Sequence, residues 1–476
     1  MAELSRRQLL QAGAVASVAN AGGDVLRVRT FDAAGKAAPP GLLGSLLATD
    51  ANGRPFELLP QSGSDGTATL ALPAEKFELT MVLPVRGFGQ VYLYADNGAA
   101  LYSAKQTTGG ELLLNYEFAR SRAAHANDSL AETMWAGEMA ALERARWRIA
   151  RRGPRPGFLF GCNAFEFDKS EEYARRFTAL LNYATLPFYR AFTEKKEGSP
   201  DYSRVDAVLA KLVGSRILTK GHPLVWFHRA GVPEFLKKKS WEEVKRSSRD
   251  YVLRSVGRYR PRIHAWDVIN EAHDWANDLG LSAEQLLEMT RLASEATREA
   301  DPTAFRVVNS CCTWGEYVAR RRSYSGPLGR RANTPLEYMK AVEDARVPYE
   351  AIGLQVYYPA RDTLEIERHL ERFFVLGKPV HITELGVSSA NEPVPSGEVR
   401  TPNRNVWHGT EWNEQIQADW VEQFYTICYS KPEIEAITWW DFSDPAFIPH
   451  AGFLHADFRP KASYERLVKL LAGWRG

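Results

Sequence analysis

The strongest constraint on the fold is an alternation of apolar runs and amphipathic segments in the C-terminal two-thirds of the 476-residue chain. After the segment GPRPG (153–157), short β-like runs alternate with helical stretches. The runs are FLFGCNAF, ALLNYAT, RILTKGHPLVW, HAWDVIN, FRVVNS, AIGLQVYY, PVHITEL and EAITWWDF. Several helical stretches begin at Ser or Thr, including Ser170, Ser240 and Thr334, as helix N-caps do. Eight such units predict an α/β fold, a TIM (β/α)8 barrel over residues 157–476.

A doubly wound open sheet is the alternative fold for this region. It is less well supported, because no glycine-rich phosphate loop follows any of the runs. The same absence counts against an oxidoreductase that binds a dinucleotide.

The region before the barrel has a different texture. Residues 24–122 contain short alternating runs separated by Gly, Pro, Asn and Asp turns, which predicts a small antiparallel β-sandwich. Residues 123–156 contain a predicted linker helix, Ser129–Arg152. The β domain is either a carbohydrate-binding module, with Tyr92, Tyr94 and Tyr102 stacking on sugars, or an accessory domain that packs on the barrel.

The first residues resemble an export signal. Ser5–Leu10 (SRRQLL) has the twin-arginine pattern, and an Ala/Gly-rich stretch and a small-x-small sequence follow it. We therefore expect a signal peptide at residues 1–23 and a periplasmic or extracellular protein; the alternative is a disordered basic N-terminus. No later apolar run is long enough to span a bilayer.

The composition limits which kinds of ligand and partner can be expected for this chain. The formal net charge is +2, so nothing points to nucleic acid or to an acidic membrane surface. The spacing of Cys and His matches no metal site, and no cofactor motif is present. The 13 Trp residues suggest stacking on flat ligands such as sugars, although large core residues explain them equally well. The oligomeric state is left open.

The active site of such a barrel forms at the carboxyl ends of its strands. That rule selects candidates from the predicted strands and the residues that directly follow them: His222, Trp226, Asn270, Glu271, Gln355, Tyr357, Glu384 and Trp440. Each of these alone has an ordinary structural explanation, such as a core aromatic or an ion-paired carboxylate. Two glutamates at the ends of two strands, with an Asn directly before one of them, favour catalysis instead.

Two carboxyl groups that face each other across a pocket are what retaining glycoside hydrolysis requires. One carboxyl group protonates the leaving oxygen, and the other must be ionised to attack the anomeric carbon. Trp and apolar neighbours would raise one pKa, while amide or imidazole donors would keep the other carboxylate ionised.

Several segments resemble glycoside hydrolase family 10, the endo-β-1,4-xylanases. Lys220–Trp226 (KGHPLVW) is similar to the GHxLVW motif of that family, and Trp266–Ala272 (WDVINEA) to its WDVVNEA signature. Ile382–Leu385 (ITEL) matches its nucleophile segment, and Gly353–Gln355 resembles its GLQ strand. The resemblance covers about residues 158–473, in the right order.

The resemblance implies roles for these residues. Glu271 would be the general acid/base and Glu384 the nucleophile. Asn270 would bind the sugar 2-hydroxyl in the −1 subsite. His222, Trp226, Gln355, Tyr357 and Trp440 would bind substrate there. The substrate would be a β-linked polysaccharide or oligosaccharide, without any metal or organic cofactor.

The chain also departs from the family pattern. An E-N-x-M-K-W stretch that holds the −2 sugar is replaced by residues 186–192 (LPFYRAF), and we expect Phe188, Tyr189 and Phe192 to line an altered subsite. Three further changes affect single positions: Tyr357 replaces a His, Gly386 an Asp and Asp441 a Gly. The first two lie where the family supports its nucleophile, which suggests a rebuilt set of supporting contacts.

These departures leave the reaction class better determined than the sugar. We therefore expect a retaining hydrolase of a xylan-like β-glycan. The alternatives are a non-catalytic glycan-binding protein on a degenerate barrel and a transglycosylase that uses the same covalent intermediate.

Overall fold

A computed structural model gives the structure of the chain. It describes residues 137–475 except 274, 320, 324–325, 329–331, 358–362, 391–406 and 408–410, together with the backbone of eight strands between residues 17 and 114. The chain divides into two compact units, Met1–Thr133 with Gly315–Arg321 and Met134–Trp314 with Arg322–Gly476. Each unit is described separately below.

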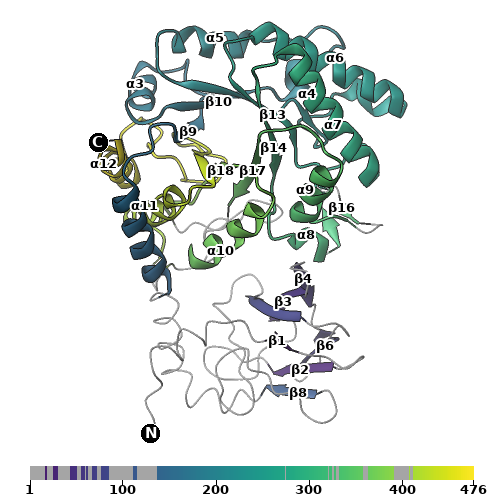
Figure 1. The fold of residues 1–476 in the computed structure, drawn as a ribbon, viewed down its shortest axis with the longest axis vertical. Helices are drawn as coiled ribbons and strands as arrows, with labels where there is room; N and C mark the ends of the chain where they lie inside the picture. The colour runs from purple at the N-terminus through teal and green to yellow at the C-terminus, as the bar shows by residue number, and fades with distance from the viewer. Residues whose placement is uncertain are drawn as a thin grey trace. The chain divides into compact units, whose positions relative to one another are not determined.

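The second unit contains a closed parallel barrel, as predicted (Figure 1). Its strands pair in the circular order β9-β10-β11-β13-β14-β17-β18-β19, and β19 returns to β9. The bounds are β9 Leu159–Asn163, β10 Tyr183–Pro187, β11 Leu218–His222, β13 Ala265–Asn270, β14 Phe305–Ser310, β17 Ala351–Val356, β18 Val380–Leu385 and β19 Ile434–Trp439. The short strand β12, Val225–Trp226, pairs with the end of β13.

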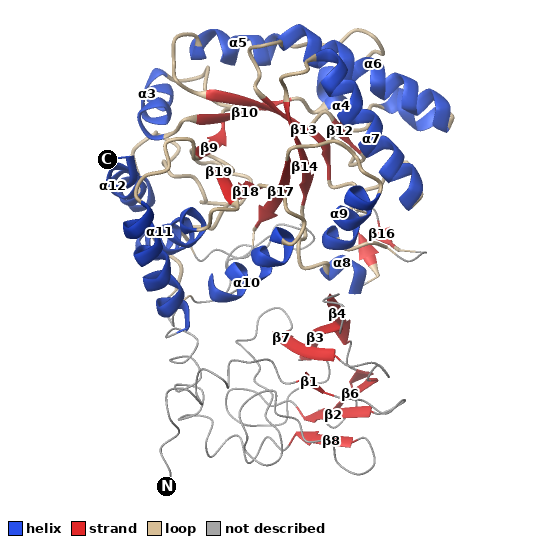
Figure 2. Cartoon of the chain, in the orientation of Figure 1, coloured by secondary structure: helices blue, strands red, loops and turns tan. Residues whose placement is uncertain are grey.

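Helices follow the strands and surround the barrel (Figure 2). The helices that return the chain to the next strand, or close the chain after β19, are α3 Glu171–Leu180, α5 Ser203–Leu212, α6 Trp241–Tyr259, α7 Ala283–Ala300, α9 Pro335–Asp344, α10 Thr363–Phe374, α11 Glu414–Ser430 and α12 Ala462–Arg475. Shorter elements come between them in the sequence: α4 Arg190–Thr193, η1 Glu234–Lys238, β15 Arg322–Ser323 and β16 Gly326–Pro327, while α8 Glu316–Ala319 belongs to the first unit. A further helix at 137–152 precedes the barrel.

The predicted helix starts are confirmed where a side chain can cap the first turn. Ser170 accepts a hydrogen bond from the Tyr173 N–H group, and Ser240, Ser282 and Thr334 each form a capping box. These caps satisfy backbone donors that the helix leaves unpaired. They fix where each helix begins and therefore how long the preceding loop is.

The barrel strands are buried on both faces, as a sheet covered by helices requires. Gly221 on β11 shows how closely they pack, because a Cβ atom there would lie 2.2 Å from the Trp266 ring. Only glycine leaves room for that fully buried indole.

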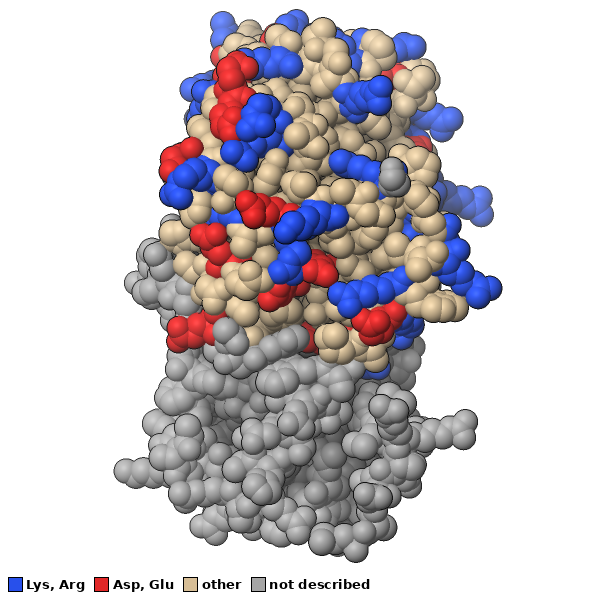
Figure 3. Space-filling model, turned by 90° about the vertical axis from the view of Figure 1, so that its left-hand side faces the viewer, with Lys and Arg blue, Asp and Glu red and all other residues tan. Residues whose placement is uncertain are grey.

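Lys, Arg, Asp and Glu side chains are interspersed on the face that Figure 3 shows. No helix in the part of the chain that the structure describes is both long and apolar enough to cross a membrane.

The first unit contains two four-stranded sheets, with orders β1-β7-β3-β4 and β5-β6-β2-β8. Their strands are β1 Ser17–Val18, β2 Val25–Arg29, β3 Leu43–Asp50, β4 Pro55–Leu58, β5 Gln61–Ser62, β6 Thr67–Ala71, β7 Phe77–Pro84 and β8 Glu111–Leu114. The prediction of purely antiparallel pairing is wrong, because β8 pairs with β2 in parallel. Alternating runs predict strands but not their direction, which depends on the path of the chain between them. The strand β1 lies inside the segment expected to be a signal peptide, and Tyr92, Tyr94 and Tyr102 lie outside the described residues.

Candidate active site

All eight residues selected from the sequence lie at the carboxyl ends of the barrel strands. Strand register places Trp226 beside Asn270, and Gln355 beside Glu384. Glu271 directly follows β13, Tyr357 lies one residue beyond β17, and Trp440 directly follows β19. The contacts described below join these residues into one cluster.

Glu271 has a backbone conformation that few residues other than glycine adopt. Its φ angle is 54°, in the left-handed region, and its side chain is almost completely buried. The indole Nε1 of Trp226 donates to Glu271 Oε2 at 2.9 Å, and the amide of Gln355 donates to Oε1 at 2.9 Å. Burial outweighs these donors and raises the pKa of Glu271 to about 7. This carboxyl group therefore retains a proton close to neutral pH.

Glu384 lies within β18 and is also buried. Its Oε1 accepts a hydrogen bond from Asn309 Nδ2 at 3.2 Å, and its Oε2 accepts one from the Tyr357 hydroxyl at 3.1 Å. The expectation that such donors keep this pKa low is wrong: burial, and next the charge of Glu271, raise the pKa of Glu384 well above its usual value. The two carboxyl groups thus titrate as a coupled pair, and protonation of Glu271 favours ionisation of Glu384.

An amide network connects the two glutamates. Asn309 Nδ2 donates to Asn270 Oδ1 at 2.7 Å as well as to Glu384, and Thr383 Oγ1 donates to Asn309 Oδ1 at 2.5 Å. Gln355 Nε2 lies 2.9 Å from Glu271 Oε1 and 3.5 Å from Asn270 Oδ1. The network fixes the orientation of the Asn270 amide, with its oxygen directed toward Asn309.

Asn309 was not among the residues selected from the sequence. A Cβ atom at Gly353 would lie 2.7 Å from Asn309 Oδ1, so the glycine next to it on β17 leaves the space that this amide occupies. The sequence feature that could have selected Asn309 is its place near the end of the fifth predicted strand. The structure shows that it is in register with Asn270.

Two buried charged residues, Lys220 and Asp267, support His222. Asp267 Oδ2 lies 2.7 Å from both Lys220 Nζ and His222 Nδ1, and all three side chains are buried. The Lys220 ammonium and the His222 hydrogen bond together hold the pKa of Asp267 below its usual value despite burial, while burial lowers the pKa of His222. A neutral His222 that donates from Nδ1 to Asp267 leaves Nε2 as an acceptor, 3.7 Å from Glu384 Oε1. Lys220 and Asp267 were not among the candidate residues selected from the sequence, although both lie inside the motifs quoted above.

Aromatic rings line one side of the cluster. The Tyr189 ring lies 5.7 Å from the His222 ring and 5.9 Å from the Trp226 ring, measured between centroids. Phe165 packs edge-on against both Tyr189, at 5.9 Å, and Trp440, at 5.7 Å. These rings offer apolar faces beside the two carboxyl groups.

The expectation that Phe188 lines the site with Tyr189 is wrong, and that for Phe192 stays a prediction. Phe188 is buried in the core, with its ring 4.8 Å from that of Trp266. Phe192 lies on α4 and is 66% exposed. Successive side chains of an extended chain point to opposite faces, so the adjacent residues Phe188 and Tyr189 need not line the same site.

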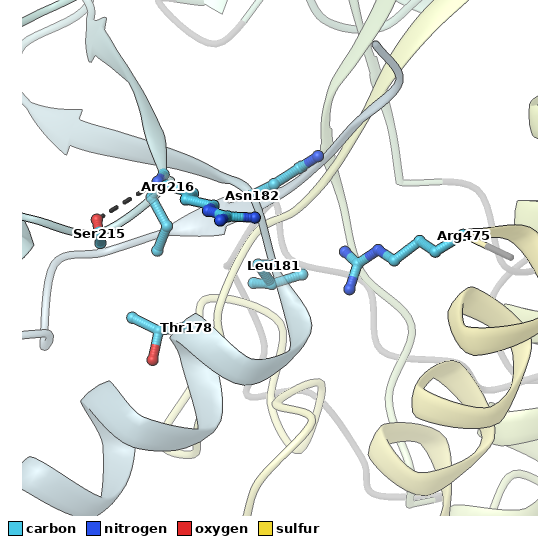
Figure 4. Close-up of a pocket in the computed structure, with 7 residues that line it drawn as sticks. Thr178, Leu181, Asn182, Ser215, Arg216 and Arg475 are labelled. Carbon is cyan, nitrogen blue, oxygen red and sulfur yellow. Dashed lines mark hydrogen bonds between the residues drawn. The ribbon is translucent and has the colours of Figure 1, made fainter. Parts of the chain in front are cut away.

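The cavity in Figure 4 lies at the other end of the barrel. It measures about 570 Å³, and its lining residues are Thr178, Leu181, Asn182, Ser215, Arg216, Ile217 and Arg475. Asn182 and Ile217 directly precede β10 and β11, so this cavity opens at the amino ends of the strands. It is therefore separate from the two glutamates. Among the described residues no group of His, Cys, Asp and Glu is arranged to hold a metal ion.

Comparison with known proteins identifies the family. The sequence model of glycosyl hydrolase family 10 matches residues 188–469, which is more than half of the chain. The chain belongs to this family. The match extends from the end of β10 to α12 and includes both glutamates, and the protein is a xylanase-like glycoside hydrolase.

Named relatives of this family 10 enzyme are xylanases. Endo-1,4-beta-xylanase B of Thermotoga neapolitana is 25% identical over 339 residues, which are 66% of this chain and 88% of the relative. Endo-1,4-beta-xylanase A of Humicola insolens is 26% identical over 290 residues, which are 58% of this chain and 68% of the relative.

Solved structures show the same barrel fold. Xylanase 10B of Thermotoga maritima has a TM-score of 0.51 at 20% identity and covers 66% of this chain and 95% of its own. A family 10 structure from Paenibacillus barcinonensis has a TM-score of 0.52 at 18% identity and covers 67% of this chain and 96% of its own.

Proposed function

We propose that this protein hydrolyses a β-linked, xylan-like glycan with retention of anomeric configuration, through a covalent glycosyl-enzyme intermediate. The observation that carries the proposal is the pair of buried carboxyl groups, Glu271 and Glu384, joined by one amide network at the barrel mouth. The xylanase relatives support xylan as the substrate.

The first step divides the work between the two carboxyl groups. Glu271 donates its proton to the glycosidic oxygen as the bond from that oxygen to C1 breaks. Glu384, as the carboxylate, attacks C1 and forms the glycosyl ester; the proton on Glu271 removes one of the charges that raise the pKa of Glu384. The leaving sugar departs as an alcohol, and Glu271 is left as a carboxylate.

The second step reverses these roles. Glu271 takes a proton from water, whose oxygen attacks C1 from the face that the leaving group vacated, and the ester bond to Glu384 breaks. Two inversions give net retention. Both carboxyl groups then return to their starting protonation states.

Neighbouring residues orient the sugar. The oxygen of the Asn270 amide is held by Asn309, so its NH2 group is available to donate to the 2-hydroxyl. His222 Nε2 is an acceptor for a further hydroxyl, and Trp226, Trp440 and Gln355 line the same subsite.

The raised pKa of Glu271 predicts a pH limit. Because this residue must be protonated in the free enzyme, kcat/KM should fall as the pH rises through about 7. The measurement is a kcat/KM profile between pH 4 and 9 on a soluble β-glycan. A flat profile up to pH 9 would exclude Glu271 as the acid.

The function itself is tested by activity on a panel of β-glycans, with NMR of the first-formed anomer. We expect the β-anomer from xylan or a related glycan, and strongly reduced turnover by Glu271→Gln. Added acceptor sugars separate hydrolysis from transglycosylation. Wild-type protein that binds xylan but releases no sugar from any member of the panel would indicate a non-catalytic binder and refute the proposal.

We further propose export by a twin-arginine signal at residues 1–23, on the basis of Arg6 and Arg7 in the SRRQLL segment. An Arg6→Lys, Arg7→Lys variant should accumulate inside the cell when expressed in a bacterium with the twin-arginine pathway. Equal export of both proteins would contradict this assignment.

The two sheets of the first unit support an accessory β-sandwich at residues 24–122, followed by a linker region at 123–156 and the hydrolase barrel at 157–476. If the sandwich binds carbohydrate, removing the residues before Asp128 should abolish pull-down on insoluble xylan and spare turnover of soluble substrate. Unchanged pull-down would assign binding to the barrel.

A further inference from the structure

Three departures from the family pattern, far apart in the sequence, lie together in the structure. Tyr357 follows β17, Gly386 follows β18, and Asp441 comes two residues after the end of β19. These strands are consecutive in the barrel, so their ends lie side by side. The three changes therefore belong to one region, next to Glu384.

Tyr357 contacts the nucleophile directly. Its hydroxyl donates to Glu384 Oε2 at 3.1 Å. Gly386 lies beside this ring: a Cβ atom at that position would lie 3.8 Å from Tyr357 Cε1 and 3.6 Å from Ala451 Cβ, at ordinary van der Waals distances.

Asp441 secures the other side of the ring. Its Oδ1 accepts from Asn163 Nδ2 at 2.9 Å, and its Oδ2 accepts from the backbone N–H group of Phe447. These bonds fix the loop after β19 so that the Phe447 ring lies 5.7 Å from that of Tyr357. A glycine at position 441 would provide neither acceptor.

We propose that Tyr357, packed against Phe447 on the loop that Asp441 fixes, is the positioning residue that orients Glu384 and favours its ionised form. The assignment rests on the proposed function and replaces a role in substrate binding for Tyr357. The three departures then act together. They replace one set of residues that supports the nucleophile with another, and they are not separate losses.

Other groups also act on the ionisation of Glu384, and the test must keep them constant. They come from several elements: Lys220 and His222 on β11, Asp267 on β13, Glu271 after β13, and the thiol of Cys311 after β14. Tyr189 and Asp441 are further groups whose charge interacts with this cluster. Replacing Tyr357 with Phe removes only its hydroxyl and leaves all of these charged and titratable groups in the protein.

The decisive variant is Tyr357→Phe, with Tyr338→Phe as its matched control. Tyr338 also makes a side-chain hydrogen bond, with Thr290 Oγ1 at 2.7 Å, but it is buried more completely than Tyr357 and lies on α9. Loss of a donor disfavours the charged carboxylate, so Tyr357→Phe should move the acidic limb of kcat/KM upward by about one pH unit. Its kcat should fall about tenfold or more with little change in KM. Tyr338→Phe should leave the profile unchanged.

A second set of variants tests whether positions 357 and 386 act together. Gly386→Asp alone should impair activity because it adds a negative charge beside Tyr357, which disfavours the ionised form of Glu384, and Tyr357→His alone should impair it because the hydroxyl is lost. The double variant should exceed both single variants in kcat/KM, since the pair restores the support that the family uses. If the double variant shows the sum of the two single losses in kcat/KM, positions 357 and 386 do not act together, and this part of the inference is overturned.

Failure of this inference and failure of the proposed function give different results. If the wild-type enzyme is active and Tyr357→Phe leaves the acidic limb in place, the role of Tyr357 is overturned and the function stands. If the wild-type enzyme is inactive on every glycan, NMR titration of 13C-labelled glutamate carboxyls, with Glu384→Gln used for assignment, still measures the Tyr357→Phe shift. An unchanged Glu384 pKa in that titration also overturns the inference.

Discussion

Replacing Glu384 with alanine is expected to reduce kcat/KM on a β-glycan by about ten-thousandfold or more, because no other group can form the bond to C1. The neighbouring donors, Asn309 and Tyr357, would lose their acceptor but not their places on adjacent strands. The measurement is steady-state turnover of an aryl β-xyloside or xylobioside.

Addition of azide provides the sharper readout for this variant. Azide should enter the space left by the carboxylate and attack C1 once, with inversion, to give an α-glycosyl azide. Glu350→Ala is the matched control, since Glu350 pairs with Arg306 at the amino end of the strands. It should keep its turnover and form no azide product. A Glu384→Ala enzyme with normal activity would remove this residue from the mechanism.

Replacing Glu271 with alanine is expected to produce a loss that depends on the leaving group. For a polysaccharide, whose leaving oxygen needs a proton, kcat/KM should fall by about 10²- to 10⁴-fold. For an aryl glycoside with an acidic phenol, bond cleavage needs no proton and should be nearly normal, so the ester with Glu384 should accumulate. A burst of phenol followed by slow turnover measures this accumulation.

The pH profile provides an independent check on the same variant. The decline of kcat/KM near pH 7 reflects loss of the Glu271 proton, so it should be absent in Glu271→Ala with the aryl substrate. Equal losses on both kinds of substrate would show that Glu271 orients substrate rather than transferring a proton.

Local sequence predicted the barrel because each strand and helix carries its own signal. Buried runs such as HAWDVIN and caps such as Ser282 and Thr334 place elements without knowledge of their partners. Glu271 and Glu384 could be selected because parallel strands bring their carboxyl ends to one rim. The strand direction of β8 had no comparable local signal.

The contacts between strands could not be predicted in the same way. Asn309 joins Asn270 to Glu384 across three strands, and only the register between them shows that its amide reaches both. The replacement of His by Tyr357 appeared as a loss in the sequence, whereas the structure shows a hydroxyl that donates to Glu384. Phe188 was assigned to the site, but its side chain, directly after β10, is completely buried in the core.

The backbone at Glu271 has a consequence for the evolution of this enzyme. A left-handed φ of 54° in a residue other than glycine costs on the order of 1 kcal/mol, and a buried carboxyl group adds to that cost. Glycine at this position would relieve both costs but would leave the donors of Trp226 and Gln355 without their acceptor. Thermal tolerance alone therefore does not report whether this carboxyl group is retained, and a stability screen of this protein needs turnover as a second criterion.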